Sequence, residues 1–310
     1  MQRGRARVDR PEGIGDGPPG TAGDQKHPHR PSSLAPHGPP VILRITVLVE
    51  RIRELDLWTV RRGEGAVPRL DRVAIEEPLE IRLDRSALAV IMRTPGHDTE
   101  LVAGLLHAEE LVRTSSDLAS IAHCTDDENT IEAHSAEGRR RSRVKAERSL
   151  LTTSSCGLCG KLTIESLHTS APPFPAYPRL DPELVHALPE RLRGVQEVFE
   201  QTGGLHAAAI FDRTGALVVG REDVGRHNAV DKCVGHLLLR DQLPLEGATL
   251  VVSGRASYEI VQKALVARIP AVIAVSAPSS LAVELARASK MFLAGFVRGG
   301  AFNVYAGQPG

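Results

Sequence analysis

The sequence predicts an α/β protein, in which a layered C-terminal domain with a partly parallel sheet follows a smaller N-terminal α+β part. From residue 207 to residue 297, short apolar runs typical of buried strands alternate with segments whose apolar residues recur at helical spacing. Strands and helices that alternate in this way form sheets covered by helices. The chain has 310 residues, of which 42% are apolar, so it can build one large or two ordinary domains.

Residues 1–40 are expected to form a disordered head. They contain 7 Gly and 8 Pro against 7 apolar residues, too little apolar surface to offset the entropy of ordering. A signal peptide needs an apolar segment that this head lacks. The first apolar run, residues 41–49, is interrupted by Arg44 and is far shorter than the roughly 20 residues that span a bilayer. We therefore expect a cytoplasmic protein without a membrane segment.

The N-terminal α+β part is expected over residues 41–150. Alternating or continuous apolar residues predict strands at 73–75, 79–83 and 87–92. A helix should follow, capped by Asp98 or Thr99. Residues 117–150 predict strands and turns with a basic stretch over 139–148, which fits either a solvated hairpin edge or a docking patch for an acidic partner.

Residues 151–180 are expected to form a loop followed by a proline-rich crossover, and residues 181–310 the α/β domain. Asp181 and Pro182 predict a helix start, and this helix should run to Gly203 and Gly204. Further strands are predicted at 207–211, 216–219, 249–252, 271–275 and 291–297, with helices around 230–237, 260–265 and 281–288. Ligands of such sheets gather where strands end and helices begin.

The sharpest local signal is the pair Cys156 and Cys159, which lies between glycines. A helix that begins near Lys161 would favour the thiolate, the form that reacts. In a cytoplasmic chain, such a pair fits half of a structural zinc site, a dithiol redox pair or a persulfide carrier in sulfur transfer. A zinc site would need two more ligands, and the chain has no second pair of this spacing.

A second arrangement suggests a zinc-dependent hydrolase. His107 and Glu109, followed by Cys156 and Cys159, have the order found in zinc deaminases, where a His and two Cys hold the metal and a Glu moves protons. The match is incomplete because Ser155 stands where a proline is expected.

Three junctions between strands and helices carry polar residues that suit a phosphate-bearing ligand. They are residues 222–229, 253–257 and 296–301, which contain acids, arginines, a histidine and glycines. A nucleic acid is not the expected partner, because aromatic residues make up only 3% of the chain and the formal net charge is +0. A single large ligand bound at all three junctions is the expectation.

These segments, taken in order, resemble the FdhD family of formate dehydrogenase accessory sulfurtransferases. The resemblance rests on residues 92–96, 155–160, 202–206, 222–228, 253–257, 276–279, 295–300 and 302–305. It covers about residues 70 to 308 and is far more specific than the cysteine pair alone. It implies a fold similar to cytidine deaminases, and it gives no role to His107.

The resemblance implies a cytoplasmic sulfur carrier. Such a protein receives persulfide sulfur from a cysteine desulfurase and passes it to the bis(molybdopterin guanine dinucleotide) molybdenum cofactor, which then enters the formate dehydrogenase catalytic subunit. Cys156 would bear the persulfide, with Cys159 as its loop partner. A non-catalytic chaperone for the cofactor and the zinc hydrolase are the alternatives. Cys124 and Cys233 are expected to have no part in the chemistry.

The cofactor is expected to be a bound substrate, with no permanent metal. The resemblance places it on Phe296, Val297, Arg298, Gly299, Gly300 and Ala301. By their chemistry, Arg255 and Arg298 suit its pyrophosphates. Asp223 or Glu222 suits a guanine amine, and His227 lies on the same turn. Asp223, Arg226 and His227 also suit a role in holding that turn together. Because the cofactor has two guanine halves, a homodimer is a hypothesis that the sequence by itself does not decide.

Overall fold

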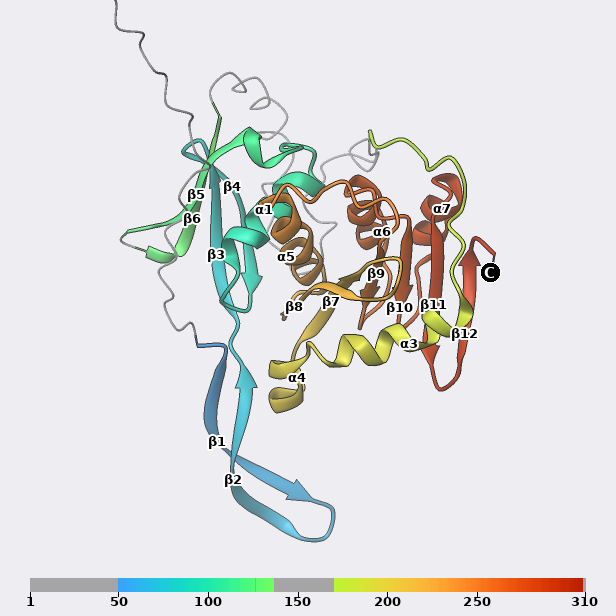
Figure 1. Ribbon diagram of the computed structural model, residues 1–310. Coiled ribbons are helices and arrows are strands. Elements are labelled where there is room, and N and C mark those ends of the chain that lie inside the picture. The colour runs from blue at the N-terminus through green and yellow to red at the C-terminus, as the bar shows by residue number, and fades with distance from the viewer. Residues whose placement is uncertain (1–49, 126, 137–169, 309–310) are drawn as a thin grey trace, which may run out of the picture. The chain divides into compact units, whose positions relative to one another are not determined.

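The computed structural model describes residues 50–125, 127–136 and 170–308, all within one unit that spans residues 48–310 (Figure 1). The strands of this part of the chain form three sheets. The largest has the order β12-β11-β10-β9-β7-β8. Its strands are β7 (His206–Phe211), β8 (Leu217–Asp223), β9 (Thr249–Val252), β10 (Ala271–Ala274), β11 (Phe292–Arg298) and β12 (Ala301–Ala306).

The six-stranded sheet is covered by helices on both faces, which confirms the predicted α/β layering. Strands β9, β10 and β11 are parallel, and the outer strands are antiparallel to their neighbours. One face packs against helices α5 (Arg226–Leu238), α6 (Tyr258–Val266) and α7 (Ser280–Ala288). The other face packs against α3 (Pro182–Arg193). Every residue of β9 and β10 is buried, as expected for central strands covered on both faces.

A second sheet belongs to the N-terminal part and has the order β4-β3-β6-β5. Its strands are β3 (Glu77–Leu83), β4 (Ser86–Arg93), β5 (Leu118–Cys124) and β6 (Asp127–Ser135), and the short helix η1 (Ser115–Asp117) precedes β5. Helix α1 (Asp98–Ala108) packs its apolar face on this sheet, and Leu101 and Leu106 are fully buried there. The predicted helix is present, but the predicted cap is wrong: His97, in the left-handed region with a φ of 60°, is the N-cap, and Asp98 is the first helical residue.

Helices α1 and α5 are in direct backbone contact. A Cβ atom on Gly104 of α1 would lie 1.9 Å from the Asp231 carbonyl oxygen, and one on Gly235 of α5 would lie 1.8 Å from the Glu100 carbonyl oxygen. Only glycine permits such a close approach. The two glycines therefore join the N-terminal layer to the α/β layer.

Two elements differ from the sequence prediction. The single helix expected from Asp181 to Gly203 is wrong, because the chain breaks at Gly194 into α3 and α4 (Glu197–Thr202). Glycine has a low helix propensity, and here it ends α3.

The hairpin of β1 (Ile52–Arg61) and β2 (Gly65–Ala74) was not predicted, except for the last two residues of β2, which belong to the strand expected at 73–75. Its side chains are mostly exposed, so it lacks the buried alternation that identifies a strand.

Several predicted features lie outside the described residues. They are the head at 1–40, the basic stretch at 139–148 and the cysteine loop up to residue 169. None of the described helices is long and apolar enough to cross a membrane.

Gly104→Ala is expected to lower the free energy of unfolding by at least about 2 kcal/mol, because the methyl group would overlap the Asp231 carbonyl and force the helices apart. Urea denaturation measures this change. Gly194→Ala is the control, since Gly194 has a φ of −62° and its nearest atom would lie 3.3 Å from the new methyl carbon. The control should change stability by less than about 0.5 kcal/mol. Equal loss in both variants would contradict the close helix crossing.

Candidate functional site

A cavity of about 850 Å³ lies at the edge of the six-stranded sheet where β9, β10 and β11 end. Ser253 follows β9, Val275 follows β10, and Arg298 ends β11. Because β7 is antiparallel to β9, its first residue, His206, lies at the same edge. The opposite wall comes from α3, α4 and the connection between them, through His186, Pro189, Glu190, Leu192, Arg193, Gln196 and Phe199. This is the edge at which the sequence predicted the ligand.

The segment expected to bind the cofactor forms one rim of this cavity. Val297, Arg298, Gly299 and Gly300 line it. The two glycines have φ values of 61° and 78°, which L side chains rarely adopt, and they make the tight turn between β11 and β12. The turn exposes backbone groups beside the Arg298 guanidinium.

The two ends of this segment do not line the cavity. Phe296 is half-buried and lies under the Arg298 side chain, with the guanidinium carbon 5.7 Å from the ring centre. Its φ is 55°, in the left-handed region, at a register irregularity in β11. Ala301 is exposed at the start of β12. The Phe296 ring therefore packs against the Arg298 guanidinium and holds it at the rim of the cavity.

Four basic side chains gather around the loop after β9. A Cβ on Gly254 would lie 3.3 Å from the His206 ring and 4.0 Å from Arg226. Burial lowers the pKa of His206, and the nearby charges of Arg226, His227 and Arg255 lower it further. His206 is therefore neutral near pH 7, and the positive charge beside the loop comes from Arg226 and Arg255.

One buried donor in this group has no partner. The Nε atom of Arg226 is buried and makes no hydrogen bond within the described part of the chain. A buried guanidinium N–H without an acceptor is costly, and an anionic ligand would satisfy it. Arg255, in contrast, is exposed on the loop. The chemistry of this group therefore suits phosphate oxygens.

His227 links the starts of α5 and α6. Its Nε2 atom lies 2.9 Å from a carboxylate oxygen of Glu259 and 3.0 Å from the Ser257 hydroxyl. Because Glu259 and Ser257 both contact this nitrogen, it links the N-terminus of α5 to the N-terminus of α6. Cofactor contact by His227, expected from the sequence, stays a prediction.

Asp223 is completely buried and makes its contacts with protein groups. One carboxylate oxygen lies 2.6 Å from Lys232 Nζ and accepts a hydrogen bond from the Thr94 amide at 3.2 Å. The other accepts from the Gly225 amide at 2.8 Å and from the Asn228 side chain at 2.9 Å. Asp223 thus holds the turn between β8 and α5, and a contact with guanine would require these bonds to break.

Glu222, the neighbouring acid, positions the far wall of the cavity. Its carboxylate accepts hydrogen bonds from the amides of Val198 at 2.9 Å and Phe199 at 2.8 Å. These amides belong to the first turn of α4, where backbone donors lack helical partners.

Sequence reasoning gave no functional role to His206, Phe199 or Arg193, and it counted Arg226 among the polar residues of a ligand-binding junction or as a holder of the turn. The signal for His206 was present, because Thr202-Gly-Gly-Leu-His206 was among the recognised segments. No signal pointed to Arg193 or Phe199, since they reach the cavity only because the chain turns at Gly194.

Two of the four cysteines, Cys124 and Cys233, lie within the described residues. Burial raises the pKa of Cys233 to about 12, and its thiol donates to the Ala208 carbonyl oxygen at 3.3 Å. Cys124 is half-buried at the end of β5. Cys156 and Cys159 lie outside the described residues. Within the described ranges, no group of three or more His, Cys, Asp or Glu side chains could hold a metal ion.

A protein-family model described as the FdhD/NarQ family matches residues 74–309. This chain belongs to the FdhD/NarQ family. The match confirms the family resemblance drawn from the sequence motifs.

Curated FdhD/NarQ relatives are similar over most of their length. The chain is 51% identical to a protein named sulfur carrier protein FdhD from Streptomyces coelicolor, over 80% of this chain and 92% of that protein. It is 45% identical to the protein of the same name from Mycobacterium tuberculosis, over 78% of this chain and 92% of that one. A crystal structure described as a formate dehydrogenase accessory protein from Desulfotalea psychrophila has a similar fold. The TM-score is 0.66 at 24% identity, covering 83% of this chain and 98% of that one.

Lys232→Met is expected to lower the free energy of unfolding by about 3 kcal/mol or more, because it leaves the Asp223 carboxylate buried without its cation. Adding Asp223→Asn should restore part of the loss. A double-mutant cycle measured by urea denaturation tests this, with Lys290→Met, on an exposed lysine, as the control. Strictly additive losses would show that the two side chains do not depend on each other.

Proposed function

We propose that this chain is a sulfur carrier. It receives persulfide sulfur from a cysteine desulfurase and transfers that sulfur to the bis(molybdopterin guanine dinucleotide) molybdenum cofactor, which formate dehydrogenase needs. The observation that carries the proposal is the high similarity to relatives named sulfur carrier protein FdhD, which are 44–51% identical to this chain. The cysteine pair and the cation-rich cavity support it.

In the first step, the Cys156 thiolate attacks the outer sulfur of the desulfurase persulfide. A new S–S bond forms on Cys156, the old S–S bond breaks, and its electron pair leaves with the desulfurase cysteine as a thiolate. Sulfur transfer of this kind makes the chain a sulfurtransferase. The terminal sulfur on Cys156 is then available to molybdenum, which binds soft sulfur ligands.

Cys159 suits the release step. Attack of its thiolate on the inner sulfur of the Cys156 persulfide forms a Cys156–Cys159 disulfide and releases the outer sulfur as hydrosulfide, a ligand for the metal. The protein's thiols are restored by a thiol reductant in the next cycle. A reducing cytoplasm supplies such thiols, which agrees with the proposed location.

The cavity at the sheet edge is the proposed seat of the cofactor substrate. Arg298 on the rim of the cavity, together with Arg226 and Arg255 near the loop at Gly254, would hold its pyrophosphates. The turn at Gly299 and Gly300 allows the ligand to approach the backbone closely. Asp223 and His227 would act by keeping the turn that presents Arg226 in place.

The proposed partners are the cysteine desulfurase, the formate dehydrogenase catalytic subunit and a second copy of this chain. The hairpin β1–β2 offers a surface for such contacts. Trp58 and Val60 on β1 are 67% and 73% exposed, and Leu70 on β2 is 57% exposed. The registers Trp58 with Pro68 and Asp56 with Leu70 place these three side chains on the same face of the hairpin.

Incubation with a cysteine desulfurase and ³⁵S-labelled cysteine should load sulfane sulfur onto the wild-type protein and not onto Cys156→Ala, because the variant lacks the accepting thiolate. Label released by a thiol reductant measures the loading. Cys124→Ala is the matched control and should load normally. If Cys156→Ala carries as much ³⁵S as the wild-type protein, Cys156 is not the sulfur carrier.

Complementation of a strain that lacks the gene for this protein distinguishes a sulfur carrier from a chaperone that only protects the cofactor. A chaperone that only protects the cofactor predicts full formate dehydrogenase activity with Cys156→Ala, whereas a sulfur carrier predicts almost none. A deaminase-type hydrolase predicts about one zinc ion per site in protein purified without chelators.

Arg298→Ala is expected to weaken binding of guanosine diphosphate, used as a fragment of the cofactor, by about tenfold or more, because a charge-assisted hydrogen bond to phosphate is lost. Isothermal titration calorimetry measures the dissociation constant. Arg61→Ala, which removes an exposed arginine of the hairpin, is the control and should bind like wild type. Equal affinities of wild type and Arg298→Ala would place the phosphates elsewhere.

A further inference from the structure

The two acids that the sequence offered to a guanine base are already bonded to the protein. Glu222 accepts hydrogen bonds from two amides in the first turn of α4, and Asp223 is fully buried among protein donors. A guanine bound in the cavity at the sheet edge therefore needs other partners. The wall opposite Arg298, which α3, α4 and their connection form, supplies them.

Gln196 lies in this wall with an unpaired side-chain amide. The residue is 7% exposed and lines the cavity. It is the N-cap residue of α4, but its side chain makes no capping hydrogen bond and none with any other residue that the structure describes. Both amide atoms nevertheless keep accessible surface, so a ligand in the cavity can reach them.

The amide of Gln196 calls for a ligand of particular chemistry. Its oxygen accepts hydrogen bonds and its neighbouring nitrogen donates them. Burial of such a group without partners is costly, because the hydrogen bonds that it makes in water are lost. A ligand that carries a donor and an acceptor side by side satisfies both atoms at once. A phosphate oxygen, which only accepts, would leave the amide oxygen unpaired.

Phe199 lines the same cavity and is 39% exposed. It follows Gln196 by three positions, and residues at this spacing lie on one face of a helix. Because Glu222 holds the first turn of α4 through the backbone, the ring and the amide keep fixed places in the wall. An accessible aromatic ring in a cavity wall is a stacking surface for a flat base.

The charged side chains of this wall balance each other. Arg193 and Glu190 both line the cavity and lie 3.6 Å apart, and each side chain is more than two-thirds exposed. The wall thus carries no net charge from this pair, unlike the rim at Arg298. Apolar residues complete the cavity lining, among them Leu192, Leu205 and Val297. These surroundings suit the neutral, flat part of a nucleotide.

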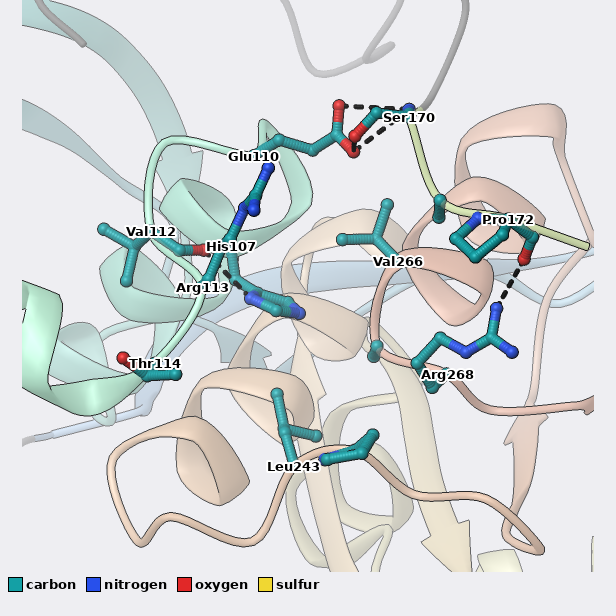
Figure 2. Close-up of a pocket in the computed structure, with 13 residues that line it drawn as sticks. His107, Glu110, Val112, Arg113, Thr114, Ser170, Pro172, Leu243, Val266 and Arg268 are labelled. Carbon is teal, nitrogen blue, oxygen red and sulfur yellow. Dashed lines mark hydrogen bonds between the residues drawn. The ribbon is translucent and has the colours of Figure 1, made fainter. Parts of the chain in front are cut away.

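The smaller cavity in Figure 2, of about 350 Å³, provides a contrast. Arg268 donates there to the Pro172 carbonyl oxygen and lies 3.9 Å from Glu246. The carboxylate of Glu110 accepts hydrogen bonds from Ser170. These charged groups have their partners within the protein, whereas the amide of Gln196 has none.

We propose that Gln196 and Phe199 bind a guanine base of the cofactor substrate. The Phe199 ring stacks on the base. The Gln196 amide oxygen accepts a hydrogen bond from the N1–H group of guanine, and the amide nitrogen donates to the neighbouring O6 atom. This base site rests on the proposed seat of the cofactor in the same cavity, and it lies on the wall opposite the arginine that holds phosphate.

Isothermal titration calorimetry of the full chain with guanosine diphosphate and with inorganic pyrophosphate tests the base site. Gln196→Leu and Phe199→Leu should each raise the dissociation constant of guanosine diphosphate about tenfold and leave that of pyrophosphate unchanged, because pyrophosphate has no base. Gln201→Leu, on an exposed glutamine of α4 that does not line the cavity, is the matched control. It should bind both ligands like wild type.

A second nucleotide tests the hydrogen bond without changing the protein. In 1-methylguanosine diphosphate a methyl group replaces the N1 proton, so wild type should bind it about tenfold more weakly than guanosine diphosphate. Equal binding of the two nucleotides overturns the proposal even if a variant does not fold.

Three further results would also overturn the base site. They are absence of guanosine diphosphate binding by wild type, unchanged binding by Gln196→Leu, and an equal loss of guanosine diphosphate and pyrophosphate binding in that variant. Sulfur loading on Cys156 is measured separately and does not involve this wall. A failure of the carrier role and a failure of the base site are therefore distinguishable.

Discussion

The contact between α1 and α5 is the constraint on which the rest of the structure depends. Two glycines, Gly104 and Gly235, let the backbones of these helices touch, and no other residue type would fit there. Behind this crossing, Lys232 of α5 is fully buried and reaches both Asp223 and the Thr94 carbonyl oxygen at 2.8 Å. A buried cation is tolerated because its carboxylate and carbonyl partners are in place. The N-terminal layer thereby fixes the turn that leads into α5.

A polar network extends this junction toward the surface. Glu100 of α1 pairs with Arg221 of β8 at 2.7 Å and with His236 of α5 at 2.8 Å. Burial alone would raise the pKa of Glu100, but hydrogen bonds from His97, Arg221 and His236 hold the pKa of this carboxyl well below its usual range. The charged form is thus favoured by folding, and its stabilisation is present above the unfolded pKa of 4.5 and is lost as the pH falls below it. The same helix pair therefore carries both apolar and ionic contacts between the layers.

The contacts between α1 and α5 also determine the geometry of the candidate site. Arg226 and His227 open α5, so their positions follow from the buried contacts of Asp223 and Lys232. Glu222, the residue before Asp223, positions α4 on the other side of the cavity. Two adjacent acids that suited a ligand by their chemistry thus organise the two walls between which the ligand is proposed to lie.

The sequence by itself determined the family, the α/β class and most of the strands and helices. It did so because buried strands and amphipathic helices leave local patterns, and because the glycine and arginine segments occur in a fixed order. Residues 297–300 were also found in this way, and the structure places them on the cavity. Element boundaries at Asp181 and Gly203 were predicted because caps are local chemistry, whereas α1 has no side-chain cap and its first residue was not predicted.

Tertiary structure alone decided which polar side chains remain available. Asp223 and Arg226 stand three positions apart on one turn, yet the carboxylate is fully paired within the protein and the guanidinium keeps an unpaired buried N–H. Likewise, nothing local shows that His107 is buried between the Val112 carbonyl on one side and distant loops on the other. Hydrogen bonds between residues more than a hundred positions apart, such as Thr94 to Asp223, leave no pattern in the chain. The physical reason is that burial and pairing are properties of the whole packing, whereas helix and strand patterns are properties of neighbouring residues.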